Sequence, residues 1–330
     1  MNRRRIAFPR SERGAALMTV LLLVAVLSVI AALMLERSTL ATRLAVNGAD
    51  RETARWQALG IESLALQEIA NLKQQNGRLP PIGIAPDGIQ QQLPFERGAA
   101  QITVRDGATC FNINSLVTGQ PGRLASNPAA MEQFARLANV VQIDQRQAQS
   151  LAAAIADWID SDQQENPGGG EDGFYLREDE PYRTGGQLIY DIGELRAIRG
   201  MDEVLFDRLR PWLCALPAAE MSALNINQLR QDQFPLIAML LPPEYPVSRV
   251  REILATRPPQ GFSSVFNFWQ TVESGQNEIS SNVQQQAVLD TRWYALETRV
   301  TIGDALLKER ALVDGRLDPP RVVWRVWDGD

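Results

Sequence analysis

The longest apolar segment of the chain lies near its N-terminus. It covers positions 15–35, AALMTVLLLVAVLSVIAALML, and contains no charged residue. About 20 apolar residues in an α-helix are enough to cross the hydrocarbon core of a membrane, whereas a secretory signal peptide has about 7 to 15. Five arginines precede the segment and Glu36 follows it. By the positive-inside rule we therefore predict a single-pass transmembrane helix with a cytoplasmic N-terminus and an exported body.

A helical period continues beyond this segment. Apolar residues recur at steps of three and four at Leu40 and Leu44, and then at Ala58, Ile61, Ala65, Ile69 and Leu72. Such spacing places them on one face of a helix. Asn76-Gly77, followed by Pro80-Pro81, is typical of a helix end. We predict one helix over 15–76, apolar in its first half and amphipathic in its second.

Alternation of apolar and polar residues predicts strands in two distant parts of the chain. Alternation around Ile102 and Val104 indicates a strand that ends in a turn at Asp106-Gly107. Three further runs near the C-terminus predict an antiparallel meander, at 293–300, 306–313 and 321–327. A strand from each part is expected in one sheet.

Between these strand regions the period is helical. Helices are predicted at 131–140, 145–159, 192–199, 201–213, 247–256 and 265–272. The predicted fold class is α+β: a long N-terminal helix packed on an antiparallel sheet, interrupted by a large all-α insert.

Composition removes several kinds of chemistry. The 330 residues include no histidine, and the formal net charge is −6. Without imidazole, Ser-His-Asp and Cys-His catalysis and histidine zinc sites are excluded. The mild acidity disfavours a broad nucleic-acid surface, which needs a basic face. We therefore do not expect an enzyme or a nucleic-acid partner.

The two cysteines, Cys110 and Cys214, lie far apart in the sequence and each has apolar neighbours. Two buried free thiols are one interpretation. If the body is exported to an oxidising compartment, a disulfide between them is favoured.

The densest group of charges lies at 157–180, a segment that contains nine carboxylates and a single basic residue, Arg177. Asp160, Asp162 and Glu171 have the spacing of positions 1, 3 and 12 of an EF-hand loop, but Glu165 stands where that loop needs glycine. Ca²⁺ accepts six to eight oxygen ligands in flexible geometry. From spacing alone, a calcium site and a solvated acidic loop remain alternatives.

A short phrase occurs twice. Phe111-Asn112-Ile113-Asn114 recurs as Leu224-Asn225-Ile226-Asn227, each time just ahead of helical sequence. Asparagine is a favoured helix N-cap because its side chain accepts a hydrogen bond from a free backbone N–H. We predict that the second asparagine of each phrase is such a cap.

Taken in order, these features resemble the K-type minor pseudopilins of type II secretion, the general secretion pathway protein K family. The basic leader that ends at Gly14 and the apolar helix that begins at Ala15 are similar to those of type IV pilins and pseudopilins. The resemblance implies cleavage after Gly14 by an inner-membrane prepilin peptidase and methylation of the new N-terminus. Thr19 stands where most pilins carry glutamate, a departure that K-type pseudopilins share.

The resemblance also covers the paired Asn-Ile-Asn phrases and the acidic loop, with its DWIDSD, GEDGFY and EPYR segments. It implies that the insert forms two lobes resembling SAM or helix-hairpin-helix modules. It further implies one or two structural Ca²⁺ ions in the loop. The expected ligands are Asp160, Asp162, Glu165, Glu171 and Asp172, with Asp179 as a weaker candidate.

The implied division of the chain is a leader, a helix, two parts of a pilin-like domain and an insert between them. The expected bounds are 1–14 for the leader, 15–76 for the helix, 77–116 and 291–330 for the pilin-like domain, and 117–290 for the insert.

The function implied is that of a minor pseudopilin in the inner membrane of a Gram-negative bacterium. Such a subunit would cap the tip of a periplasmic pseudopilus and help to initiate its assembly for the export of folded proteins. Implied partners are the I-type and J-type minor pseudopilins, the major pseudopilin filament, the prepilin peptidase and the assembly platform. Two hairpin-like segments, 192–202 and 255–262, support an alternative, a competence-type pseudopilin that binds DNA.

Overall fold

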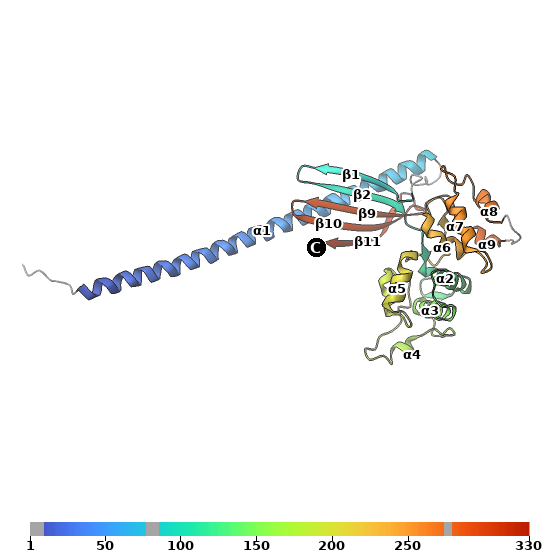
Figure 1. Ribbon diagram of the computed structural model, residues 1–330, viewed down its shortest axis with the longest axis horizontal. Coiled ribbons are helices and arrows are strands. Elements are labelled where there is room, and N and C mark those ends of the chain that lie inside the picture. The colour runs from blue at the N-terminus through green and yellow to red at the C-terminus, as the bar shows by residue number, and fades with distance from the viewer. Residues whose placement is uncertain (1–9, 77–85, 274–278, 330) are drawn as a thin grey trace, which may run out of the picture.

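One helix dominates the shape of the molecule (Figure 1). The computed structural model describes residues 10–76, 86–273 and 279–329. Helix α1 extends over Arg10–Asn76, and its N-terminal half projects from the rest of the molecule as a rod. Every residue from 16 to 49 is exposed. By length and composition this helix could cross a membrane, and it ends at the residue that the sequence predicted.

A five-stranded antiparallel sheet packs on the C-terminal half of α1. Its strand order is β1-β2-β9-β10-β11, with bounds Ile89–Phe95, Gly98–Asp106, Trp293–Ile302, Ala305–Asp314 and Arg321–Gly329. The predicted strand that ends at Asp106 and the predicted C-terminal meander are both present. The first strand, β1, was not predicted, because three consecutive glutamines interrupt its alternation.

Small side chains bring α1 close to the sheet. Ala54, Ala58 and Ile61 of the helix are buried against Ala100 of β2 and Val300 of β9. Alanine at one-turn spacing leaves room for the strands to approach the helix axis, so the apolar face of the helix and one face of the sheet form a single core. This part of the predicted fold class, a long helix on an antiparallel sheet, is confirmed.

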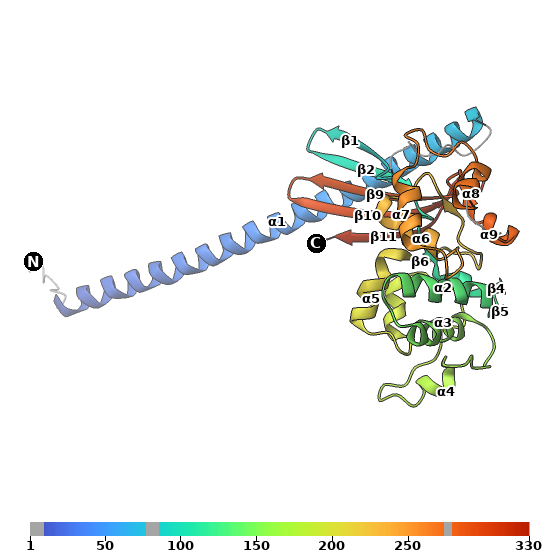
Figure 2. The ribbon, with the colours of Figure 1, turned by 45° about the vertical axis from the view of Figure 1, so that its right-hand side comes forward.

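The chain leaves the sheet after Asp106 and returns at Trp293. The intervening residues form two lobes that lie together at one end of the sheet (Figure 2). The first lobe contains α2 (Pro128–Val140), α3 (Gln145–Ile159), α4 (Asp172–Tyr175), the 3-10 helix η2 (Ile192–Ala197), α5 (Glu203–Leu209) and η3 (Arg210–Trp212). The second contains η4 (Gln231–Gln233), α6 (Phe234–Ala238), α7 (Val247–Ala255), α8 (Val265–Glu273) and α9 (Ser281–Gln284). One cluster of buried apolar residues runs through both lobes.

The prediction that the insert is all-α was wrong in one respect. Two pairs of short strands lie within 117–290: the antiparallel hairpin β4 (Val117–Gln120) with β5 (Arg123–Ser126), and the parallel pair β7 (Leu224–Asn225) with β8 (Ala287–Val288). A second parallel pair joins β6 (Leu213–Cys214) of the insert to β3 (Phe111–Asn112), which precedes it. Each parallel pair joins the beginning of a lobe to its end. Where the beginning and the end of a lobe meet, their buried main-chain N–H and C=O groups need hydrogen-bond partners. A two-residue strand pair supplies these partners. Strands of two residues are too short to show alternation in a sequence.

Two predicted helices are shorter or tighter than expected. The segment 192–199 forms the 3-10 helix η2 rather than an α-helix. In the segment 201–213, α5 begins only after Asp202, whose side chain accepts a hydrogen bond from Leu205 N at 2.8 Å. Pro211 then lies in the tighter turn of η3, because proline lacks the N–H that a helix interior requires. The likeness of the lobes to SAM or helix-hairpin-helix modules stays a prediction.

Candidate functional site

The first Asn-Ile-Asn phrase connects the beginning of the first lobe to segments that follow 75 and 102 residues later. Asn112, not Asn114, is the cap: its side-chain oxygen accepts hydrogen bonds from the backbone N–H of Asn114 at 3.2 Å and of Leu216 at 3.0 Å. Asn114 is fully buried. Its side-chain amide donates to the carbonyls of Ile189 and Leu216 and accepts from Ile189 N, each at 2.8 Å. The predicted capping role of the second asparagine was therefore wrong. A side-chain amide that carries both donors and an acceptor can bind a distant backbone segment as another strand would.

The second phrase repeats this arrangement in the second lobe. The side-chain oxygen of Asn225 accepts from Asn227 N at 3.1 Å, and Asn227 in turn binds both the N–H and the carbonyl of Phe262, at 2.8 and 3.1 Å. Asn227 therefore has the same role as Asn114, which is tertiary rather than local. The internal echo in the sequence marks two lobes that are closed in the same way.

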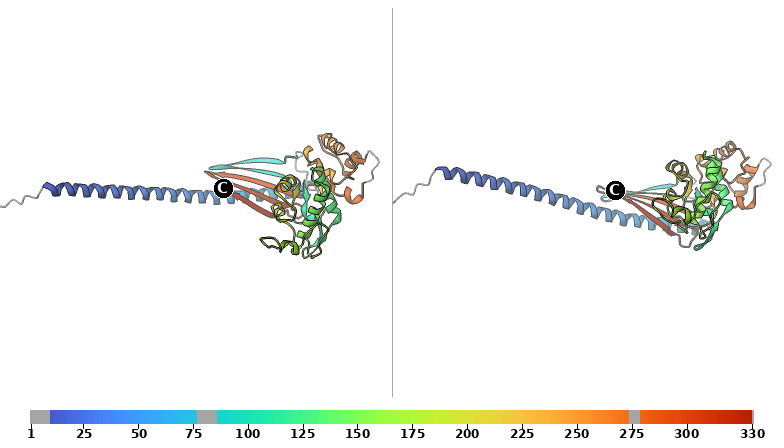
Figure 3. Two further views of the ribbon diagram at one scale, coloured as in Figure 1. Left: turned by 60° about the horizontal axis from the view of Figure 1, so that its bottom comes forward. Right: turned by 90° about the horizontal axis from the view of Figure 1, so that it is seen from below.

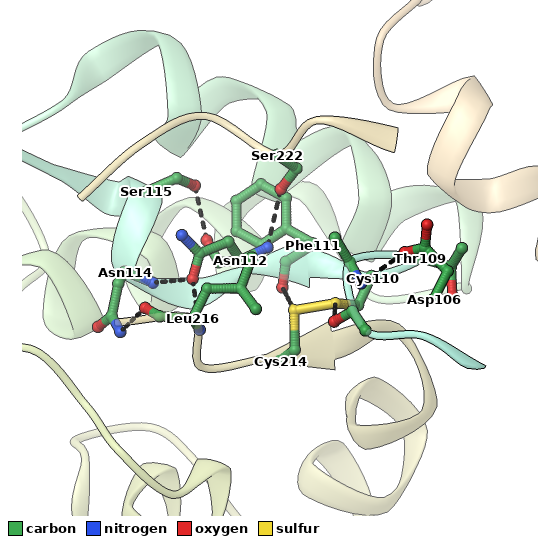
Figure 4. The surroundings of a disulfide bond; sticks show 12 residues. Asp106, Thr109, Cys110, Phe111, Asn112, Asn114, Ser115, Cys214, Leu216 and Ser222 are labelled. Carbon is green, nitrogen blue, oxygen red and sulfur yellow. Dashed lines mark hydrogen bonds between the residues drawn. A yellow bond between two sulfur atoms is a disulfide. The ribbon is translucent and has the colours of Figure 1, made fainter. Parts of the chain in front are cut away.

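Cys110 and Cys214 form a disulfide whose Cα atoms are 5.8 Å apart. It lies beside the β3–β6 pair, and Figure 4 shows it next to the hydrogen bonds that Asn112 makes with Asn114 and Leu216. The bond closes a segment with a sequence separation of 104 residues. The first lobe is therefore bounded covalently at its connection to the sheet.

The acidic loop follows α3, and three of its carboxylates converge. Oxygens of Asp157, Asp160 and Glu171 all lie within 4.8 Å of one another. Asp157 and Asp160 are one turn apart at the end of α3, and Glu171 immediately precedes α4. The three residues are only 1%, 3% and 6% exposed, respectively. Isolated buried carboxylates are costly, so this grouping requires protons or a cation.

Asp157 organises the loop and was not among the predicted ligands. Its carboxylate accepts from Asn166 N at 3.2 Å and from Gly170 N at 2.8 Å. The sequence did contain a signal for its position, because residues three apart on a helix share one face. Asp157 and Asp160 meet this condition within DWIDSD.

Asp160 and Glu171 hold the oxygens that the protein leaves unsatisfied. Ser126 Oγ donates to Asp160 Oδ2 at 3.0 Å, whereas Asp160 Oδ1 and both carboxylate oxygens of Glu171 are buried without a hydrogen-bond partner among the described residues. Burial, and then the neighbouring carboxylates, raises the pKa of Asp160 to about 6 and that of Glu171 to about 8. Buried oxygens that converge without donors suit a hard cation such as Ca²⁺, so the residues present fit the predicted metal.

The other predicted ligands point elsewhere. Asp162 is exposed and accepts a hydrogen bond from Gln164 N at 2.8 Å. Glu165 forms an ion pair with Arg199 at 3.2 Å. Asp179 is exposed on the distal part of the loop.

Asp172 likewise lies outside the group of three, and its carboxylate has partners within the loop. Its carboxylate accepts from Thr184 N at 3.0 Å and from Arg183 at 2.8 Å. Burial would raise the pKa of Asp172, but the bonds from Thr184 and the charge of Arg183 outweigh it and lower that pKa. The structure thus groups Asp160 and Glu171 with Asp157, and leaves Asp162, Glu165, Asp172 and Asp179 outside the cluster.

The arginines of the hairpin-like segment 192–202 bind other groups of the first lobe. Arg199 hydrogen-bonds the carbonyl of Gly169 and stacks on the Phe174 ring, with its guanidinium carbon 4.3 Å from the ring centroid. Arg196 pairs with Glu203 through two hydrogen bonds of 2.9 and 3.0 Å. Both guanidinium groups are thus paired with groups of the same lobe, an arrangement that serves its internal structure.

Comparisons with known proteins agree with this architecture. Two family models, both described as type II secretion system (T2SS), protein K, match residues 109–218 and 224–290. The chain is 31% identical over 324 residues to the type II secretion system protein K of Pectobacterium carotovorum subsp. carotovorum, which covers 96% of this chain and 97% of that protein. It is 33% identical over 306 residues to the protein of the same name from Klebsiella pneumoniae, with 92% of each chain covered.

A solved structure shares the fold. It is the crystal structure of the GspK-GspI-GspJ complex from the enterotoxigenic Escherichia coli type 2 secretion system, with a TM-score of 0.70 and 25% identity. The match covers 84% of this chain and 97% of the other. The long helix, the antiparallel sheet and the interrupting insert define a minor pseudopilin, a structural class rather than a known class of enzyme. The chain belongs to the type II secretion system protein K family, which confirms the resemblance seen in the sequence.

Proposed function

We propose that this subunit occupies the tip of the periplasmic pseudopilus, where it helps to initiate assembly and ends the filament. The observation that carries the proposal is the position of the insert. Helix α1 projects from one end of the sheet, and both lobes lie at the other end (Figures 1 and 3). In a filament of parallel helices, a subunit stacked above would have to enter the volume of the lobes, and close-packed bodies exclude one another.

The uncovered length of α1 supports assembly through the helix. Its large apolar side chains are exposed beyond the apolar segment as well as within it: Leu40 by 57%, Leu44 by 64%, Trp56 by 71% and Leu64 by 61%. Apolar surface on this scale marks a membrane or protein contact. We propose that helices of the I-type and J-type minor pseudopilins cover it, since the matched structure is a complex of K, I and J proteins. We also propose the major pseudopilin filament and the assembly platform as partners.

Thr19 supports the tip position. Its hydroxyl donates to the carbonyl of Ala16 at 2.9 Å, so it is satisfied within its own helix. A carboxylate at this position would serve to neutralise the amino terminus of a neighbour ahead, because an unpaired charge in an apolar environment is costly. A tip subunit has no such neighbour. Gly14 and Ala15 lie within α1, and we propose that the prepilin peptidase cuts between them and methylates Ala15.

An end-labelling experiment tests the tip position. Gly122, in the β4–β5 turn, has a positive φ of 79° and open space around it, so an epitope inserted there should leave the fold intact. The tagged full chain is co-produced with the other pseudopilins, and isolated pseudopili are labelled with gold-conjugated antibody. We expect gold at one end of each filament. Gold along the whole length would refute the tip position, as would an uncut N-terminus in cells that contain the peptidase.

We also propose that one structural Ca²⁺ binds among Asp157, Asp160 and Glu171, with the remaining ligands supplied by the loop or water. The ion would neutralise carboxylates whose mutual repulsion otherwise opposes folding of the loop. Outside the cytosol, calcium is abundant enough to fill even weak sites and so to stabilise the folded state.

A further inference from the structure

The two edges of the sheet differ in how well they are protected. At one edge, β1 contains Pro94, which has no N–H to donate to a further strand. At the other edge, β11 reads RVVWRVWDG and contains no proline. Val323 and Val326 on this strand are each 36% exposed. The strand also contains Arg321, Arg325 and Asp328, and its register against β10 shifts at Leu312/Val313. The template for an additional strand is therefore its regularly paired part, 324–329, in which the Arg325 side chain is bound to Glu62 of α1.

An apolar hollow adjoins the β11 edge. Its volume is about 360 Å³, and it lies where the sheet meets the first lobe. Residues of β10, β11 and the lobe line it, among them Leu312, Trp324, Val326, Tyr190, Ile192 and Leu213. Tyr190 is 63% exposed. A hollow of this size accepts one or two large apolar side chains.

The wall of this hollow contains a hydrogen-bond donor that the protein does not use. Trp324 Nε1 is buried and has no acceptor among the described residues. Leaving such a donor unsatisfied is unfavourable, and buried indole N–H groups usually have a partner. A main-chain or side-chain carbonyl brought into the hollow would be such a partner.

The chemistry of the edge identifies the occupant as an extended polypeptide. The outer side of β11 presents main-chain N–H and C=O groups that no strand pairs in the described part of the chain. A helix placed there would leave these groups unpaired, whereas an added strand pairs them and places alternate side chains toward the sheet.

The direction of β11 indicates where the occupant comes from. The strand runs away from the lobes toward the exposed half of α1 (Figure 1). That is the side on which the next subunit lies if this chain is at the tip.

We propose that an extended segment of the neighbouring pseudopilin pairs with β11 and inserts an apolar side chain into the adjoining hollow. This inference rests on the proposed function. It adds to helix packing a second, directional contact, since strand pairing defines the register of two subunits while an apolar helix face permits sliding and rotation.

Hydrogen exchange of the full-length chain in detergent, alone and co-assembled with the I-type and J-type subunits, tests the proposal. In the chain alone, we expect rapid exchange at the outward amides of 321–328. On co-assembly, we expect exchange of these amides to slow at least tenfold while the amides of 89–95, at the other edge, do not change.

The other outcomes are distinguishable. Co-assembly without slower exchange in 321–328 overturns the contact at β11 and leaves the proposed function standing. Absence of co-assembly overturns both. Concentration-dependent protection of β11 in the chain alone identifies a second copy as the occupant and also overturns the proposal.

A matched pair of variants provides a second test. Val326→Lys places a charge in the wall of the hollow, and Gln92→Lys places the same charge on β1. Because both side chains are exposed, we expect both free variants to melt like the wild-type chain. Recovery of the partner that covers β11 should fall at least tenfold for Val326→Lys and remain unchanged for Gln92→Lys. Equal recovery with both variants would refute the contact, and if Val326→Lys melts early the exchange measurement decides.

Discussion

Arg325 of the last strand donates two hydrogen bonds to Glu62 of helix α1, a residue 263 positions earlier in the chain, with its Nε 2.9 Å from Oε2 of that carboxylate. The same Nε also lies 2.9 Å from Oε1 of Glu309 on β10, an ion pair in which neither Glu309 oxygen has a hydrogen-bond partner among the described residues. Both carboxylates are almost completely buried. One guanidinium thus joins the helix to two strands.

Removal of this guanidinium should be severely destabilising. Arg325→Met leaves two buried carboxylates without a counter-charge, and we expect it to lower the free energy of unfolding by roughly 3 to 5 kcal/mol. Adding Glu62→Gln and Glu309→Gln should restore most of the loss. Denaturant unfolding of the full chain in detergent measures both effects.

The matched control is Arg310→Met on the neighbouring strand. Arg310 forms an ion pair with Asp328, and each of the two side chains is 54% exposed. It should cost less than about 1 kcal/mol, because exposed pairs contribute little. If both arginine variants lose the same free energy of unfolding, the burial of Glu62 and Glu309 does not explain the cost of removing Arg325.

Glu309 should make stability depend on pH. Burial raises its pKa and the Glu62 carboxylate raises it further, against the opposing effect of Arg325. The folded state therefore binds this proton more tightly than the unfolded chain. The resulting stability is fully present below pH 4.5 and is lost as the pH rises toward neutrality. Glu309→Gln should thus be more stable than the wild-type chain at pH 8, by roughly 1 to 2 kcal/mol, and should lose this advantage at pH 4.5. The measurement is the difference in free energy of unfolding between Glu309→Gln and the wild-type chain. If this difference is the same at pH 4.5 and pH 8, Glu309 is not the group responsible.

The disulfide should account for much of the stability of the first lobe. A cross-link that closes about 100 residues restricts the unfolded chain, an effect worth roughly 4 to 5 kcal/mol in the loop-entropy model. Unfolding of the Cys110→Ser, Cys214→Ser double variant should reveal a loss of this order in oxidising buffer. Reductant should destabilise the wild-type chain and have no effect on the variant. Insensitivity of the wild-type chain to reductant would disprove this role.

Calcium removal should destabilise the first lobe. We expect a chelator to lower the melting temperature of the full chain and excess Ca²⁺ to restore it, because a ligand that binds only the folded state stabilises it. Glu171→Gln should abolish this response, since its two oxygens have no other partner in the described structure. Asp179→Asn is the control and should respond as the wild-type chain does. If chelation leaves every melting temperature unchanged, the proposed site is wrong.

Prediction from the sequence succeeded where contacts are local and periodic. The apolar run and the three-to-four spacing of α1 need no knowledge of the rest of the chain, and the C-terminal meander joins neighbours in sequence through short turns. It failed for β1, whose glutamines carry no alternation because its edge is solvated. It failed for Asn114 and Asn227 because their partners lie 75 and 35 residues away.

The candidate metal site shows the same division. The sequence located the acidic loop and two of its three convergent carboxylates, Asp160 and Glu171. It also suggested Asp162, Glu165, Asp172 and, more weakly, Asp179, because spacing along a loop does not reveal which side chains its turns direct inward. The three-residue spacing placed Asp157 on the helix face of Asp160, but only the fold showed that Glu171 of the returning loop meets both.

By itself, the sequence determined a histidine-free chain with one long helix apolar enough to cross a membrane, a C-terminal meander and a helical insert, because hydrophobic period and composition are properties of consecutive residues. The tertiary structure alone decided which groups are deprived of water. Folding buries Asp157, Asp160 and Glu171 together among the nine carboxylates of the loop and brings Arg325 to Glu62. It also leaves the outer edge of β11 without a paired strand in the described part of the chain. These are distances between residues remote in the chain, and the energies that depend on them arise only on folding.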